Sequence, residues 1–386
     1  MSAAPANTLL SEAVLEAGQL DRLLDAIHAA GYGLVGPVVR DGAIALEPIQ
    51  QASDLPAGWV EEQAPGSYRL EREGSLFFGH TVGPSSWKRF LNPPRVRLFS
   101  AKTDGRSFAV TDGADPALPT AFLGVRPCDV AAIAVLDRVM LGGPVADPVY
   151  RERREKCLIV AVQCTRAAKT CFCASMGTGP RARAGFDLAL TEVREEDRHY
   201  FVLESGSPRG DSLLAALEAR AADEPERAAA ARAVARASEQ MGRTLDTLGL
   251  DTRLRSNPEH PQWEKVAARC LACGNCTQVC PTCFCTSVVD AATLGGGGAS
   301  RVRRWDSCFA PDFSFIHGGG ARTSVRARWR HWVTHKLGTW HEQFGGSGCT
   351  GCGRCITWCP AGIDFTEETA AIRAVPRRGE APNADA

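Results

Sequence analysis

The sequence predicts an α+β protein with an N-terminal mixed α/β domain, a helical connector and a C-terminal, mostly helical, cysteine-rich domain. Three observations predict this order. Short apolar runs alternate with turn residues up to about residue 205, an alanine-rich stretch follows, and most of the 16 cysteines gather after residue 258. The expected divisions are a small mixed region at 1–70, an α/β domain at 71–210, a helical connector at 211–257, the cysteine-rich domain at 258–373 and a disordered tail at 374–386.

The elements of the N-terminal half follow from local periodicity. The apolar spacing over 9–30 predicts a helix that ends at Gly31. A second helix is expected at 129–141, directly after Pro127. Strands are expected at 33–39, 43–47, 96–100, 108–111, 121–125, 158–163, 186–191 and 200–204.

Composition excludes several classes of protein. The 44 basic and 44 acidic residues balance, so no global charge favours nucleic acid or an anionic membrane surface. No apolar run approaches the ~20 residues that a transmembrane helix needs, and no secretory leader is recognisable. We therefore expect a cytoplasmic protein without a membrane span, in which the cysteines hold metal or do redox work and do not form disulfides.

Two cysteine runs carry the strongest signal. Both follow the pattern C-x2-C-x2-C-x3-C-P, which is typical of bacterial ferredoxins that hold [4Fe–4S] clusters. Three closely spaced thiolates can bind three irons of one cluster, while the fourth cysteine points away and in two-cluster ferredoxins binds the other cluster. The expected ligands are Cys270, Cys273, Cys276 and Cys359 for the first cluster, and Cys349, Cys352, Cys355 and Cys280 for the second.

Zinc is the alternative reading of these runs. Zinc sites usually pair two C-x2-C elements across a longer spacer, and a duplicated four-cysteine run fits that pattern poorly. The segment 281–348 between the runs is much longer than in a compact ferredoxin, so we expect it to form helices and loops around the clusters. Gly274, Gly351 and Gly353 suit loops whose backbone approaches the cluster closely.

A third metal site is a further hypothesis. The stretch Thr170–Ser175 reads TCFCAS, and TCFCTS recurs after Cys280. In the N-terminal domain the candidate ligands are Cys128, Cys164, Cys171 and Cys173. Cys128 would lie at a strand–helix turn and Cys164 just past a strand end, where α/β domains place functional residues. The alternative is that these four are reduced thiols packed in loops. Cys283, Cys285 and Cys308 are expected either beside the clusters or in ordinary packing.

No catalytic residues are evident. The tetraglycine at 295–298 is not a phosphate-binding loop, and the chain carries no flavin, nicotinamide or nucleotide motif. Seven arginines and one lysine lie between 301 and 336. Cations are expected near a cluster whose four thiolates give it net negative charge, and they would also suit an acidic partner.

The ordered combination of motifs resembles one family over about residues 70–370. The stretches that carry the resemblance are GVRPCD at 124–129, TCFCASMGTGP at 170–180, GFDL at 185–188, CPTCFC at 280–285, WDSC at 305–308 and the second cysteine run. They are similar to those of the beta subunits of cytoplasmic group 3 nickel–iron hydrogenases, the sulfhydrogenases. The related electron-transfer subunit of anaerobic sulfite reductase is similar as well.

This resemblance implies an electron-transfer subunit with two [4Fe–4S] clusters and a candidate third iron–sulfur cluster. The implied partners are a flavin subunit that exchanges electrons with NAD(P)H and the small and large subunits of a hydrogenase. The alternative partner is the catalytic subunit of a sulfite reductase. The chain lacks the paired C-x2-C termini of a nickel–iron large subunit, so it is not expected to activate hydrogen itself.

Overall fold

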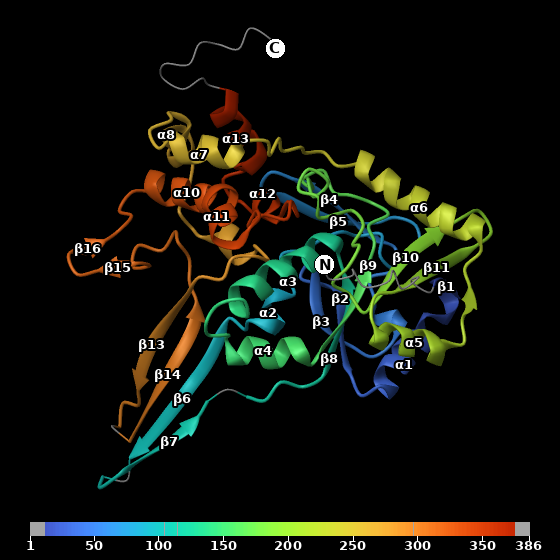
Figure 1. Cartoon of the computed structure of the whole chain (residues 1–386), viewed down its shortest axis with the longest axis horizontal. Helices are drawn as coiled ribbons and strands as arrows, with labels where there is room; N and C mark the ends of the chain where they lie inside the picture. Colours follow the sequence, from blue (N-terminus) through green and yellow to red (C-terminus); the bar gives the residue numbers. More distant parts are fainter. Residues whose placement is uncertain (1–11, 104, 114, 296, 375–386) are drawn as a thin grey trace, which may run out of the picture.

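An eight-stranded sheet with the order β12-β1-β11-β10-β9-β8-β2-β3 forms one half of the molecule (Figure 1). The computed structural model describes residues 12–103, 105–113, 115–295 and 297–374. The strands of this sheet are β1 Glu12–Glu16, β2 Gly33–Arg40, β3 Ala43–Ile49, β8 Thr120–Val125, β9 Cys157–Val162, β10 Leu188–Arg194, β11 His199–Ser205 and β12 Arg220–Ala221. The central pairs β2–β8, β8–β9 and β9–β10 are parallel, and the others are antiparallel.

Helices cover both faces of this sheet. Every residue of β9 is buried, as expected for a parallel strand with apolar layers on both sides. One layer joins β9 to α1 and α5, and the other joins it to α3 and α4. The helices of this half are α1 Leu20–Ala29, α2 Lys88–Leu91, α3 Pro127–Met140, α4 Pro148–Glu155, α5 Pro208–Leu217 and α6 Glu224–Glu239, with short 3-10 turns η1 Ala17–Gln19 and η2 Ala52–Asp54.

Short helices build the C-terminal half around the cysteine runs. They are α7 Leu250–Ser256, α8 Gln262–Ala267, α9 Asn275–Gln278, α10 Val325–Thr334, the π-helical turn η3 His335–Thr339, α11 Trp340–Phe344, α12 Arg354–Thr357 and α13 Phe365–Ala374. Trp263, Trp329 and Trp332 are buried in the apolar core that these helices share. In the described residues, no helix combines the length and the apolar character needed to cross a lipid bilayer.

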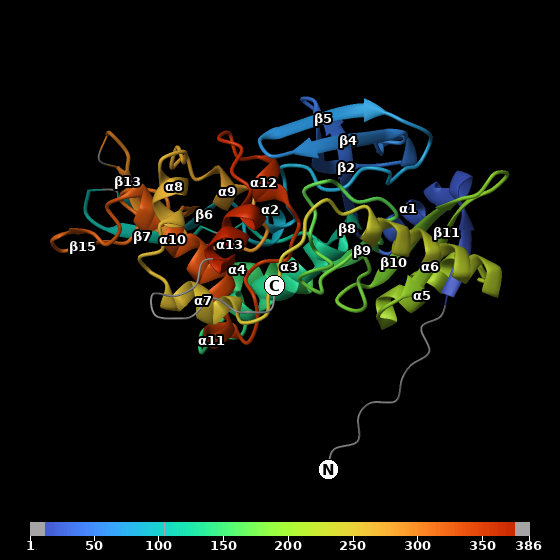
Figure 2. The same ribbon diagram turned by 90° about the horizontal axis from the view of Figure 1, so that it is seen from above.

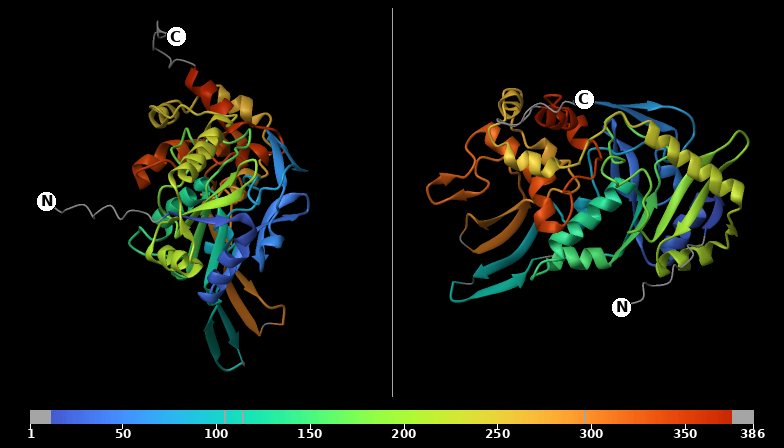
Figure 3. Two further views of the ribbon diagram at one scale, coloured as in Figure 1. Left: turned by 90° about the vertical axis from the view of Figure 1, so that its right-hand side faces the viewer. Right: turned by 45° about the horizontal axis from the view of Figure 1, so that its top comes forward.

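Two further sheets extend from the body. The hairpin of β4 Trp59–Ala64 and β5 Ser67–Arg72 reaches the C-terminal helices, where the backbone N–H of Gly66 donates to the carbonyl of Ile356 at 3.1 Å (Figure 2). A four-stranded antiparallel sheet projects away from the body (Figure 3). Its strands, in spatial order, are β13 Thr286–Ala292, β14 Gly298–Trp305, β6 Arg95–Thr103 and β7 Phe108–Asp112. Strands β15 Phe315–Ile316 and β16 Gly319–Gly320 form a small separate ribbon.

The expected mixed α/β fold with a mostly helical cysteine-rich half is confirmed, but several boundaries differ. Residues 12–16, expected in a helix over 9–30, form β1 because they pair with β11 at the sheet edge. Residues 1–70 are not a separate region, since β1, β2 and β3 belong to the same sheet as β8 to β11. The insertion 281–348 contains strands as well as helices, and β14 pairs with β6 of the N-terminal half. Residues 1–11 and the tail from 375 lie outside the described residues.

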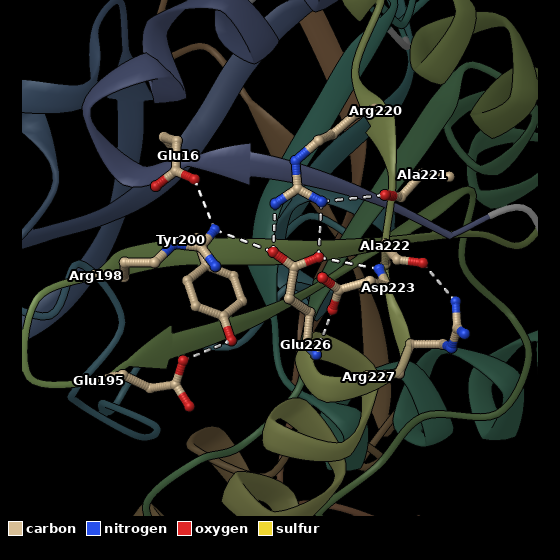
Figure 4. A network of polar contacts seen from close by, with 10 residues as sticks. All are labelled: Glu16, Glu195, Arg198, Tyr200, Arg220, Ala221, Ala222, Asp223, Glu226 and Arg227. Atoms are coloured by element: carbon tan, nitrogen blue, oxygen red, sulfur yellow. Dashed lines mark hydrogen bonds and ion pairs between the residues drawn. The ribbon is translucent and has the colours of Figure 1, made fainter.

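A polar network holds α6 against the sheet edge (Figure 4). The Glu226 carboxylate accepts hydrogen bonds from Arg220 Nη1 at 2.8 Å, Arg198 Nη2 at 3.0 Å and the Asp223 backbone N–H at 3.0 Å. Hydrogen bonding from Arg220 is the largest cause that lowers the pKa of Glu226, to about 2. Asp223 caps the helix by accepting from the Glu226 backbone N–H at 2.9 Å.

We expect Glu226→Gln to lower the free energy of unfolding at pH 7 by about 1–2 kcal/mol, because hydrogen bonds from cations are lost and the arginines are half exposed. A lowered carboxyl pKa stabilises the fold above the unfolded value of 4.5, and this contribution disappears as the pH falls toward 2. Urea unfolding of both proteins at pH 7 and pH 3 should therefore show a smaller difference at pH 3. Glu224→Gln, at an exposed position in the same helical turn, is the control and should change neither value.

Candidate iron–sulfur centres

The first group of candidate ligands gathers between α8, α9 and α12. Cys270 follows α8, Cys273 and Cys276 lie on the next turn, and Cys359 follows α12. Burial is the largest cause that raises the pKa of Cys270 and Cys276, and the neighbouring Cys359 thiol raises both further. The four cysteines line a small cavity of about 30 Å³ with apolar walls, in which Phe309, Trp329, Trp332, Ile363 and Phe365 take part. Cys273 is exposed, so this group lies at the surface.

The second group lies deeper and includes the last cysteine of the first run. Burial raises the pKa of Cys349 to about 12, and the thiols of Cys352 and Cys280 lie near enough to raise it as well. Cys355 is raised by Cys349, Cys352 and Cys280 in the same way, after burial. The structure therefore brings Cys280 to the second run and Cys359 to the first. This is the crossed grouping that the spacing predicts, although which cysteines bind iron stays a prediction.

The surroundings of both groups suit iron–sulfur clusters. Backbone N–H groups donate to two of the sulfurs, from Ala272 to Cys270 and from Gly351 to Cys349, each at 3.4 Å. Hydrogen bonds of this kind stabilise the negative charge of cluster sulfurs. Among the described residues, no three His, Cys, Asp or Glu side chains converge as the ligands of a single metal ion do. A cubane cluster places its four irons, and hence its ligands, farther apart than one ion does.

The three glycines of the cysteine runs adopt backbone conformations that favour glycine. Gly274, Gly351 and Gly353 have φ values of 72°, 66° and 75°. The two glycines of the second run also face the loop of the N-terminal half. A Cβ at Gly353 would lie 2.4 Å from the Thr170 carbonyl oxygen, and one at Gly351 would lie 2.6 Å from the Phe172 carbonyl oxygen. Their close approach is thus to another backbone segment, a reason that the sequence did not reveal.

The candidate third group is brought together at the carboxyl ends of two neighbouring parallel strands. Cys128 lies at the start of α3, directly after β8, and Cys164 follows β9. Cys171 and Cys173 lie on the loop after Cys164 and are buried. Burial raises the pKa of Cys171 to about 12, and the thiol of Cys164 raises it further. Ligation of iron in this group stays a prediction.

The third group adjoins the second. After burial, the Cys352 thiol is among the groups that raise the pKa values of Cys128, Cys171 and Cys173. The Phe172 backbone N–H donates to the Gly351 carbonyl at 2.9 Å, and the Thr178 hydroxyl donates to the Thr350 carbonyl at 2.6 Å. The loop of the third group is therefore packed directly on the second cysteine run.

Buried donor groups surround the third group. Burial raises the pKa of Cys164, while the charge of Arg126 and a hydrogen bond from it act in the opposite direction. Within the described residues, Arg126 Nε, Arg166 Nη1 and His80 Nδ1 are buried without a hydrogen-bond partner. Cationic or N–H groups of this kind fit a negatively charged cluster, and buried polar atoms without partners are unusual.

A buried ion pair joins the second and third groups. Arg354, between Cys352 and Cys355, donates to both oxygens of Asp129 at 2.7 and 2.8 Å, and Asp129 follows Cys128. Both side chains are 2–3% exposed. Arg354 Nε also donates to the Gly83 carbonyl at 2.9 Å. Sequence reasoning missed both residues, although each is adjacent to a candidate ligand.

The remaining cysteines lie beside these groups. Cys308 is the neighbour that, after burial, raises the pKa of Cys276 most. Cys283 forms a side-chain hydrogen bond with Cys280. Lys336 is a second contact of Cys280, and sequence reasoning had included it only within a basic segment. Burial alone would lower the pKa of Lys336, but the thiols of Cys280, Cys283 and Cys349 raise it above its ordinary value.

Comparison with known proteins agrees with this geometry. Residues 269–363, which contain both cysteine runs, match the family described as 4Fe-4S dicluster domain. Sulfhydrogenase 2 subunit beta of Pyrococcus furiosus is 33% identical over 321 residues, which cover 80% of this chain and 89% of that protein. The chain belongs to the sulfhydrogenase beta-subunit family. No solved structure matches it.

Membership of the sulfhydrogenase beta-subunit family confirms the resemblance found in the sequence. Together with the dicluster domain, it identifies an iron–sulfur electron-transfer subunit. The aligned length extends well beyond the dicluster domain, so the similarity to the Pyrococcus protein includes a large part of the N-terminal half as well.

Proposed function

We propose that this chain passes single electrons between a flavin subunit that reacts with NAD(P)H and the small and large subunits of a nickel–iron hydrogenase, in the cytoplasm. The observation that carries the proposal is the continuous row of cysteine groups. Cys276 of the first group lies near Cys355 of the second, and Cys352 of the second lies near Cys128 of the third. Bound [4Fe–4S] clusters would supply one-electron redox chemistry at each group.

In this proposal the first run and Cys359 hold one cluster, and the second run and Cys280 hold another. Cys128, Cys164, Cys171 and Cys173 hold a third. The buried donors near Cys164 support the third cluster, since a cluster would provide the negative charge that they lack. The proposed functional divisions are the N-terminal half with the third cluster and residues 258–373 with the other two.

The two ends of the row are the proposed points of electron exchange with partners. At one end Cys273 is exposed, and the neighbouring Leu271 side chain is 67% exposed. At the other end a cleft of about 940 Å³ lies between the β4–β5 hairpin and the loop after Cys164, with Arg166 and Lys169 in its wall. A partner protein docked on either end would approach a cluster without crossing the core.

The first test counts iron, acid-labile sulfide and zinc in anaerobically purified protein. Three clusters predict about twelve irons and twelve sulfides per chain, and two predict about eight of each. Cys171→Ser should remove about four irons, while Cys157→Ala, a buried cysteine in β9 outside every group, should remove none. Unchanged iron in Cys171→Ser would exclude the third cluster, and zinc without sulfide would exclude the whole proposal.

A second test addresses the partners. The isolated chain should neither oxidise NAD(P)H nor consume hydrogen. With the flavin subunit present, NAD(P)H should reduce its clusters, which is followed by bleaching of their visible absorption. Addition of the hydrogenase pair and hydrogen should produce the same bleaching from the other side. Reduction by NAD(P)H in the absence of any flavin subunit would contradict the proposed division of labour.

A further inference from the structure

Lys336 is buried at the junction of the two cysteine runs. It lies on the π-helical turn η3, a type of irregularity often found at functional sites, and its side chain is 6% exposed. Its ammonium donates to Cys280 Sγ at 3.2 Å, to Thr282 Oγ1 at 2.8 Å and to the Gly348 carbonyl at 3.1 Å. An ammonium group has three protons, so these acceptors satisfy all of its donors.

These contacts join two segments that the proposed function brings to one cluster. Cys280 ends the first run, and Gly348 directly precedes Cys349, which begins the second. The charges that face the ammonium include the thiols of Cys280, Cys283 and Cys349. Removing a cation from water costs several kcal/mol unless nearby negative charge compensates for it. A negatively charged cluster on Cys280 and Cys349 would provide that compensation.

A second buried lysine lies close by but contacts no sulfur. Lys88 is 3% exposed, donates to the Cys283 carbonyl at 3.0 Å and lies 3.8 Å from the centre of the Trp305 ring. The chain has six lysines, all within the described residues, and only Lys88 and Lys336 are buried. Both buried lysines therefore lie beside the second cysteine group, and only Lys336 bonds to a candidate ligand.

The first group has different surroundings. The walls of its cavity are apolar and aromatic, and the hydrogen bond to Cys270 comes from a backbone N–H. A buried positive charge stabilises a cluster more in its reduced form, which carries one more negative charge, and a hydrogen bond to a ligand sulfur acts in the same direction. Two clusters with the same ligand motif are thus held in environments of unequal charge.

We propose that Lys336 is a positioning residue that orients Cys280 and makes the cluster of Cys280, Cys349, Cys352 and Cys355 easier to reduce than the cluster of the first group. This inference rests on the proposed function, because it requires clusters at both groups. It adds an order to them. The second cluster holds the electron in the partly reduced protein, and the first, nearer the surface, exchanges electrons at a lower potential.

The test is an anaerobic potentiometric titration of the full, cluster-loaded chain, followed by low-temperature EPR. Lys336→Met should shift one midpoint potential to a more negative value and leave the other unchanged. Lys336→Arg, which keeps the charge, should restore most of the potential. Lys88→Met is the matched control and should give a smaller shift, since its ammonium bonds to a carbonyl. The titration of Cys276→Ser, which disturbs the first cluster, identifies the second cluster's signal.

Unchanged midpoints in Lys336→Met with full iron content would overturn the inference, as would a shift confined to the first cluster. If the methionine variant loses iron, Lys336→Gln, which keeps an N–H donor without charge, should carry the same negative shift. Loss of iron in both would show that Lys336 acts on assembly and not on potential. Wild-type protein with fewer than two clusters would instead overturn the proposed function, so the two failures are distinguishable.

Discussion

Asp129→Ala should lower the free energy of unfolding by about 3–5 kcal/mol, because it leaves the Arg354 guanidinium buried without its counter-charge. The pair is bidentate, and both side chains are almost inaccessible to water, so water cannot replace the lost carboxylate. Arg354→Met should cost a similar amount, since it leaves the carboxylate alone. Urea unfolding of the anaerobic, cluster-loaded chain measures both effects.

The double variant Asp129→Leu with Arg354→Met separates charge burial from packing. Replacing a buried ion pair with apolar residues is often neutral, so the double variant should be more stable than either single variant. Arg301 and Asp290 form a matched control, because this pair is also bidentate but both side chains are exposed. Asp290→Ala should give no measurable change. Equal losses at Asp129 and Asp290 would contradict the argument.

The sequence was informative where local spacing determines structure. Strands such as β8, β9 and β11 were predicted because they are apolar runs between turn residues. Residues 12–16 were mistaken for helix because their apolar residues fit the spacing of the following helix, whereas pairing with β11 decides their conformation. Pairing of β14 with β6 joins segments nearly two hundred residues apart, and no local pattern contains that information.

The candidate sites divide in the same way. The eight cysteines of the two runs could be found because a cluster requires several thiolates at fixed short spacing. Arg354 and Lys336 could not, since their roles depend on partners that only the folded chain brings near. A weak signal existed for Lys336, as lysine is rare in a chain whose basic residues are almost all arginine. The value of that signal becomes clear only with its burial.

Gly353→Ala should abolish assembly of the second cluster, whereas the equivalent change in the first run should be tolerated. Gly274 and Gly353 occupy the same position of the C-x2-C-x2-C pattern and have nearly equal φ values of 72° and 75°. Alanine therefore costs about 1–2 kcal/mol of backbone strain at either position. The difference lies in what the added methyl group meets.

At Gly274 the nearest atom to an added Cβ is the Ser307 hydroxyl oxygen at 3.0 Å, the end of a small side chain that can rotate away. At Gly353 it is the Thr170 carbonyl oxygen at 2.4 Å, which is backbone and cannot move without displacing the loop that carries Cys171. Overpacking of this kind adds about 1–3 kcal/mol, and it acts where the second and third groups meet. Iron content and EPR of the two variants measure the result. Equal iron loss in both would mean that backbone strain decides assembly. Loss confined to Gly353→Ala would mean that contact between the two halves of the chain is part of how the second cluster is held.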